Sequence, residues 1–115
     1  MILHSEKFKD IRIAVVGDVV LDKYVSGIAR RISSEAAIPV LLARRIGHVA
    51  GGAANVAANL SGIGCSVSVY GAVGDDGNSV LLSELLDEKK IENKLLQIDG
   101  RPTTIKTRIV AGNQQ

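Results

Sequence analysis

The sequence of 115 residues predicts an α/β fold, with helices on the faces of a parallel sheet. Residues 11–16 form a largely β-branched, apolar run, which is typical of a strand buried on both faces. Residues 67–70 and 95–98 indicate two further strands, and residues 51–63 and about 78–90 indicate helices between the strands. Because strands alternate with helices, the sheet is expected to be parallel, with right-handed crossover connections.

A second group of strands is predicted outside this sheet. Short strands are expected at residues 24–27 and 38–43, on either side of the polar stretch 29–37. Pro39 has no amide hydrogen to donate, which favours a strand start or an edge strand there. In residues 103–110, Thr, Lys and Arg alternate with Ile and Val, which indicates a strand with one solvent-exposed face. We expect these three strands to form a small antiparallel layer beside the main sheet.

The two predicted helices begin and end at recognisable residues. The first begins at Gly51 and is ended by Gly62 and Gly64. The second has Asn78 or Ser79 as its N-terminal cap. Its spacing places apolar and acidic side chains on opposite sides. The apolar stripe consists of Leu81, Leu82, Leu85 and Leu86, and the outward side carries Glu84, Asp87 and Glu88.

Composition and charge exclude several functional classes. The net charge is +2 with acids and bases interspersed, which argues against a nucleic-acid-binding patch. No apolar run approaches the ~20 residues that cross a bilayer, and residues 1–10 lack the apolar core of a signal peptide. A cytoplasmic location is therefore expected. Cys65 is the only cysteine and has no second ligand at metal-site spacing, so we expect a small buried side chain and no metal site.

Polar residues and glycines follow the predicted strands at their carboxyl ends, where open α/β sheets bind ligands. Gly51 to Asn55 open the first helix, and glycine lets a ligand approach the unpaired amides of a helix start. Taken alone, this run is equally compatible with close packing of the helix on the sheet. Asp22 is expected to accept hydrogen bonds from sugar hydroxyls, and Asp18 to bond its own backbone in a turn. Asp75-Asp76 is expected to cap the second helix rather than to bind a cation.

Three segments resemble the amino-terminal half of the ribokinase-like (PfkB) carbohydrate kinases. These are Gly-Asp-Val-Val-Leu-Asp at residues 17–22, Gly-Gly-Ala-Ala-Asn at residues 51–55, and Gly64 with Gly74 ten positions on. The resemblance covers nearly the whole chain. It implies a ribokinase-like Rossmann-type sheet with helices on its faces, together with a small antiparallel β-lid.

Within that family, the chain is most similar to the heptose 7-phosphate kinase module of bifunctional ADP-heptose synthesis proteins. The residues that carry this narrower resemblance are 31–40 and 101–108. The family usually has prolines where Ser34 and Ala37 stand, which leaves the fine substrate specificity open.

The resemblance implies a role for each segment. Positions that hold the sugar hydroxyls in the family are matched here by Asp22, Gly51, Gly52 and Asn55. Residues of about 24–45 and 103–112 match lid strands that cover the sugar and often pair with a second subunit. Lys106 and Arg108 alternate onto one lid face, where both would meet a phosphate on the heptose. The alternative for these two side chains is an ordinary solvated strand face.

In the family, the second half of the domain supplies the nucleotide site and a catalytic aspartate in a Gly-Ala-Gly-Asp type motif, and this sequence contains no such motif. The resemblance therefore implies that residues 1–115 are one partial domain, the sugar-binding portion of an ATP-dependent kinase that phosphorylates heptose 7-phosphate at the anomeric hydroxyl. ATP and Mg²⁺ are implied for the intact enzyme only, and we expect the chain alone to be inactive.

Two other functions remain open from the sequence. The chain could be a non-catalytic sugar-phosphate-binding protein, or part of a ribokinase-like kinase for another sugar. In each case the partner is a small sugar or sugar phosphate. We also expect a homo-oligomer, formed through the lid strands or through an exposed sheet edge.

Overall fold

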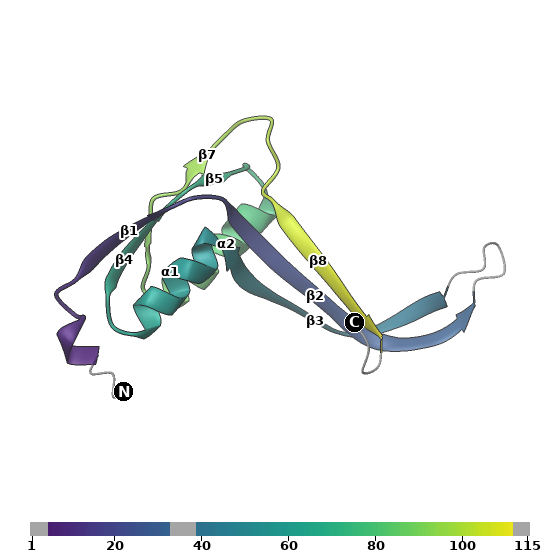
Figure 1. The fold of residues 1–115 in the computed structure, drawn as a ribbon. Coiled ribbons are helices and arrows are strands. Elements are labelled where there is room, and N and C mark those ends of the chain that lie inside the picture. The colour runs from purple at the N-terminus through teal and green to yellow at the C-terminus, as the bar shows by residue number, and fades with distance from the viewer. Residues whose placement is uncertain (1–4, 33–38, 112–115) are drawn as a thin grey trace. The chain divides into compact units, whose positions relative to one another are not determined.

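The computed structural model describes residues 5–32 and 39–111 of the chain (Figure 1). Within these residues, contacts define two compact units. We call them the helical unit and the three-strand unit. The helical unit combines residues 5–21 with 49–105, and the three-strand unit combines residues 22–32, 39–48 and 106–111. No helix in the described parts of the chain is long and apolar enough to span a membrane.

The helical unit is built on a parallel sheet in the order β1-β4-β6. The register pairs Ile13 with Val67 and Val15 with Val69. The strands are β1 (Arg12–Val16), β4 (Ser66–Tyr70) and β6 (Glu92–Asn93), and a second parallel pair consists of β5 (Ala72–Val73) and β7 (Leu96–Gln97). A short 3-10 helix, η1 (Ser5–Lys7), precedes β1. The α/β class and the parallel pairing are thus confirmed.

The core of the helical unit lies on one face of this sheet. Val67 and Val69 of β4 are buried, whereas Ser66 and Tyr70, whose side chains alternate with them, are exposed. Val16 of β1 is 77% exposed. The prediction that the first strand is buried on both faces is therefore wrong, because among the described residues the helices cover only one face. Cys65 is buried, as expected.

Helix α1 (Ala53–Gly62) begins two residues later than predicted. The reason is that β3 (Pro39–Gly52) continues through both glycines, so that Gly51 and Gly52 end a strand instead of opening the helix. The predicted glycine stop is confirmed. Gly64 has a φ of 108°, in the left-handed region that favours glycine.

Helix α2 (Gly77–Glu88) is capped by a residue of the Asp75-Asp76 pair, for which capping is predicted from the sequence. The cap is Asp76, whose side chain accepts a hydrogen bond from the amide of Ser79, so the prediction of Asn78 or Ser79 is wrong. Asp76 has an extended backbone, as is typical of an N-terminal cap, and the helix begins at the next residue, Gly77. The predicted stripe holds: Leu82 and Leu86 are fully buried, Leu81 and Leu85 partly buried, and Glu84, Asp87 and Glu88 exposed.

The remaining strands form a sheet in the order β3-β2-β8. The strands β2 (Val19–Ile32) and β8 (Ile105–Ala111) lie beside β3, and β2 and β3 are longer than the predicted short strands. Pro39 begins β3, an edge strand, as its missing amide hydrogen predicted. Residues 33–38, with most of the predicted polar stretch, lie outside the described residues.

The directions of these strands differ in part from the expected antiparallel layer. Figure 1 shows β3 running opposite to β2, and β8 running in the same direction as β2, so the sheet is mixed. The antiparallel pair consists of β2 and β3, which follow each other in the chain. The long connection through both helices allows β8 to pair in parallel.

Candidate functional site

The start of α1 depends on glycine. Gly52 has a φ of 58°, and a Cβ at this position would collide with the carbonyl oxygen of Asp18. That same oxygen accepts a hydrogen bond of 2.7 Å from the amide of Ala53. Both the backbone conformation and the close approach of Asp18 therefore require glycine at residue 52.

No side chain caps this helix. The first-turn amides of Ala54 and Asn55 have no partner in the helix itself, and they carry the positive end of the helix dipole. Gly52 and Asn55 are exposed, whereas Gly51 is buried. Ala53 and Ala54 are buried, so Asn55, with its amide and its carboxamide, is the donor residue of the α1 start that can meet a hydroxyl or an anionic group.

The start of α2 is closed by a network of hydrogen bonds. Asp76 Oδ1 accepts from the amide of Ser79 at 2.9 Å and from Thr103 Oγ1 at 2.7 Å, while Oδ2 accepts from the amide of Thr103 at 2.8 Å. Thr103 Oγ1 in turn accepts from the amide of Gly74 at 3.0 Å. The Thr103 hydroxyl is the main cause that lowers the pKa of Asp76, followed by the two amide donors.

This network confirms that Asp76 caps α2. Both carboxylate oxygens already accept hydrogen bonds from the protein. In the described parts of the chain, no group of three or more His, Cys, Asp or Glu side chains is placed to hold a metal ion.

The other predicted residues lie in the three-strand unit. The amide of Leu21 in β2 donates to the carbonyl oxygen of Thr104 at 2.9 Å. In a pair of parallel strands, the residue whose amide donates such a bond lies opposite the residue that follows the acceptor in the sequence. The same rule holds in the β5-β7 pair, where Leu96 donates to Gly71 and lies opposite Ala72. Leu21 therefore lies opposite Ile105, the first residue of β8.

Continuing this register along β2 and β8 brings Asp22 opposite Lys106 and Tyr24 opposite Arg108. Opposite residues of a parallel pair project from the same face of a sheet, and residues two apart in a strand share that face. Asp22, Lys106 and Arg108 thus share one face of the sheet β3-β2-β8. Asp22 is half-buried, and the two basic residues are exposed.

Tyr24 is a residue of this face that the sequence analysis did not single out. A Cβ at Gly47 of β3 would collide with the Cζ and Oη atoms of the Tyr24 ring, so the ring lies across the backbone of β3 at this glycine. The spacing of two from Asp22 places Tyr24 on the candidate face. The sequence alone, however, does not show which residue of β3 lies beneath it.

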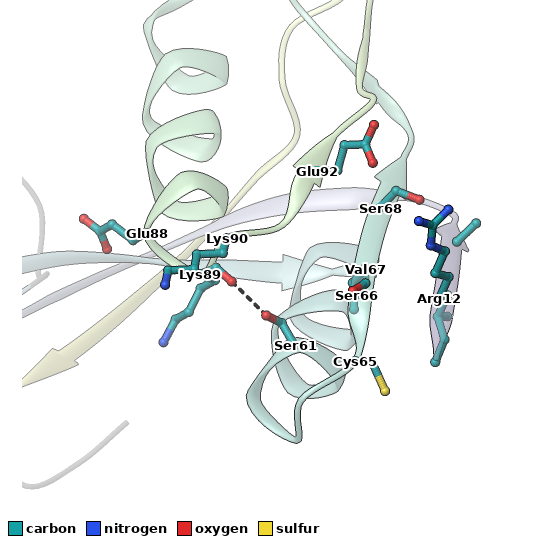
Figure 2. A pocket seen from close by; sticks show the side chains of 12 residues that line it. Arg12, Ser61, Cys65, Ser66, Val67, Ser68, Glu88, Lys89, Lys90 and Glu92 are labelled. Atoms are coloured by element: carbon teal, nitrogen blue, oxygen red, sulfur yellow. Dashed lines mark hydrogen bonds between the residues drawn. The ribbon is translucent and has the colours of Figure 1, made fainter. Parts of the chain in front are cut away.

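Two of the pockets among the described residues are lined by the helical unit. The larger, of about 870 Å³, lies where β1, β4 and β6 begin, and it is lined by Arg12, Ser66 and Glu92 among others (Figure 2). None of the predicted site residues lines it. A second pocket of about 540 Å³ is lined by residues of α1 and α2, including Asn55. Asn55 is the one predicted site residue in either pocket.

Comparison with known proteins identifies the chain's relatives. Residues 10–115 match the model of the pfkB family carbohydrate kinases. The bifunctional protein HldE of Actinobacillus pleuropneumoniae is 41% identical over 115 residues, which is 100% of this chain and 24% of that protein. HldE of Coxiella burnetii (strain RSA 331 / Henzerling II) is 44% identical over 108 residues, covering 94% of this chain and 23% of its own length.

A solved structure shows the same fold. The structure of Arabidopsis thaliana ribokinase complexed with ribose and ATP superposes with a TM-score of 0.71 at 24% identity, and the match covers 91% of this chain and 33% of that one. This chain spans about a quarter of the length of the HldE relatives. The family match over nearly the whole sequence, together with this fold, shows that the chain belongs to the pfkB family of carbohydrate kinases.

Proposed function

We propose that the chain is the sugar-binding portion of an ATP-dependent kinase that phosphorylates heptose 7-phosphate at its anomeric hydroxyl. This reaction belongs to the synthesis of ADP-heptose for the lipopolysaccharide core. The observation that carries the choice of substrate is the identity of 41% and 44% to HldE proteins over all or nearly all of the chain. The uncapped helix start at Gly52 supports a ligand site.

Each candidate residue has a chemical task in this proposal. Asn55, beside Gly52 at the α1 start, binds sugar hydroxyls through its amide and its carboxamide, and the Asp22 carboxylate accepts a hydrogen bond from another hydroxyl. Lys106 and Arg108 bind the phosphate, with arginine supplying a two-pronged contact. That Asp22 and Asn55 bind one and the same sugar stays a prediction. Gly51 is buried, and we assign it the task of leading the backbone from β3 into α1.

ATP and Mg²⁺ belong to the proposal for the intact enzyme. We assign the described residues no role in binding either group. The proposal for these 115 residues is binding of the sugar phosphate without turnover. An ATP-consumption assay with heptose 7-phosphate tests it, since turnover by this chain alone contradicts the proposal.

Calorimetric titration tests the substrate class. We expect heptose 7-phosphate to bind more tightly than ribose or fructose 6-phosphate. R108Q removes one phosphate contact and is expected to weaken binding of heptose 7-phosphate about tenfold, which corresponds to about 1.4 kcal/mol. The matched control is R44Q: Arg44 is also exposed, but it lies three residues from Gly47 and so projects from the opposite face of β3.

Equal losses in R108Q and R44Q would show only a general charge effect. Failure of all three sugars to bind the wild-type chain would contradict the proposed function itself.

We also propose that the chain associates with a second copy of itself through the three-strand unit. Ile46 and Ile109 are 57% and 60% exposed, and alternation places both on the face opposite Tyr24 and Arg108. Exposed apolar side chains on one sheet face favour a protein contact. Sedimentation should show association that I109D weakens, and a concentration-independent monomer would overturn this.

A further inference from the structure

The Tyr24 ring is a feature of the three-strand unit that the proposed function does not use. Tyr24 leaves β2 on the same face as Asp22, and its ring extends over Gly47 of the neighbouring strand β3. Lys106 and Arg108 lie on the other side of β2, because the strand order is β3-β2-β8. The face therefore has a charged half over β8 and an aromatic half over β3, with Asp22 in the middle strand.

Gly47 is what allows the ring to lie in this position. Any side chain there would occupy the space of the Tyr24 ring atoms and push the ring away from the backbone. With β3 beneath its ring, Tyr24 remains 39% exposed, which leaves part of its surface available on the face of the candidate residues.

We propose that Tyr24 is a specificity-determining residue, whose ring is the platform for the C–H face of a pyranose ring while the charged half of the sheet face binds its hydroxyls and phosphate. This inference rests on the proposed function. A pyranose carries hydroxyls around its edge and C–H groups on its faces, so it fits a surface that combines an aromatic ring with charged groups. Inorganic phosphate uses the charged half only.

A purely structural role for the ring makes a different prediction. Aromatic side chains also cover glycines in neighbouring strands to stabilise a sheet. In that case removal of the ring lowers the melting temperature and leaves the affinity for sugars unchanged. Binding and stability therefore have to be measured on the same variants.

The first experiment is calorimetry on the 115-residue chain with heptose 7-phosphate and, separately, inorganic phosphate. Y24L should weaken binding of the sugar phosphate about five- to tenfold, with no change for phosphate. G47A keeps the tyrosine but displaces its ring, and should weaken sugar binding in the same direction. The control is Y70L, because Tyr70 is exposed to the same degree, 40%, but lies in β4. Unchanged sugar affinity in Y24L would overturn the proposal.

The second experiment separates this inference from the proposed function. The chain has no Trp and only two Tyr, so in Y70F the tyrosine fluorescence comes from Tyr24 alone. Titration of Y70F with methyl α-mannoside, a pyranose without phosphate, should change this fluorescence even if heptose 7-phosphate proves not to be the substrate. No change at any concentration of the glycoside would show that the ring contacts no sugar.

Discussion

The two helices of the helical unit begin in opposite ways. At α1, Gly52 brings no side chain and no side chain caps the helix; the Ala53 amide donates to the carbonyl oxygen of Asp18, and Asn55 stays exposed. At α2, the Asp76 carboxylate accepts from the amide of Ser79 and also holds Thr103. A carboxylate at a helix start satisfies the amides and offsets the positive end of the dipole, whereas glycine leaves both for a ligand. The closed start serves stability, and we infer that the open start serves binding.

The largest expected effect comes from giving the open start a side chain. G52A forces alanine to a φ of 58° and into the carbonyl oxygen of Asp18. We expect a loss of more than about 2 kcal/mol in the free energy of unfolding, since a sparsely populated backbone conformation with positive φ alone costs about 1–3 kcal/mol. Urea unfolding followed by circular dichroism measures it.

The control for G52A is the glycine that opens the closed helix. Gly77 has an ordinary φ, and a Cβ there would meet nothing within 4 Å. G77A should therefore raise the stability by about 0.4–1 kcal/mol, because alanine restricts the unfolded chain. Equal effects of G52A and G77A on stability would contradict the difference between the two helix starts.

A smaller loss of stability is expected when the hydrogen-bond network at the start of α2 is weakened. T103V removes the hydroxyl that donates to Asp76 and accepts from the buried amide of Gly74. The unpaired amide should cost about 1–3 kcal/mol of stability. T104V is the control, since Thr104 is the adjacent exposed residue. Equal melting temperatures for T103V and wild type would mean that the network does not stabilise the fold.

Sequence periodicity was sufficient for the parts of the fold whose local pattern matches their environment. The strands β1 and β4 and the stripe of α2 follow from apolar spacing alone. The two-residue strands β5 and β6 could not be predicted, because their pairing with β7 and β4 defines them rather than their own residues. The burial of β1 on both faces was wrongly predicted, because its residues are apolar on both sides of the strand. Among the described residues, the helices cover only one face of the sheet.

The candidate site was predictable only where its residues are close in sequence. The Gly-Gly-Ala-Ala-Asn run marks the α1 start because glycine and small residues lie next to each other. Capping by Asp75-Asp76 could be predicted, but the bond from Thr103 to Asp76 could not, because it links residues 27 positions apart. Tyr24 needed the position of Gly47 across two strands. Contacts of this kind depend on register, which alternation fixes only up to a shift of two residues.

The smallest effect is a change in the pH dependence of stability. Hydrogen bonds from Thr103 and Ser79 hold the pKa of Asp76 below its ordinary value in the folded chain. The stabilisation from this carboxylate is therefore complete above the unfolded-state pKa of about 3.9 and is lost as the pH falls through the lower folded value. α1 contributes no such dependence, since no acidic residue caps it or lies in its first turn.

Melting temperatures of wild type and D76N between pH 7 and pH 2 test this difference. D76N should start lower at neutral pH and fall less steeply below pH 4, because it has no proton to bind at this position. T103V should move the acid limb of the curve toward higher pH, since it removes the main cause of the lowered Asp76 pKa. Parallel curves for wild type and D76N would show that the ionised cap does not distinguish the closed start from the open one.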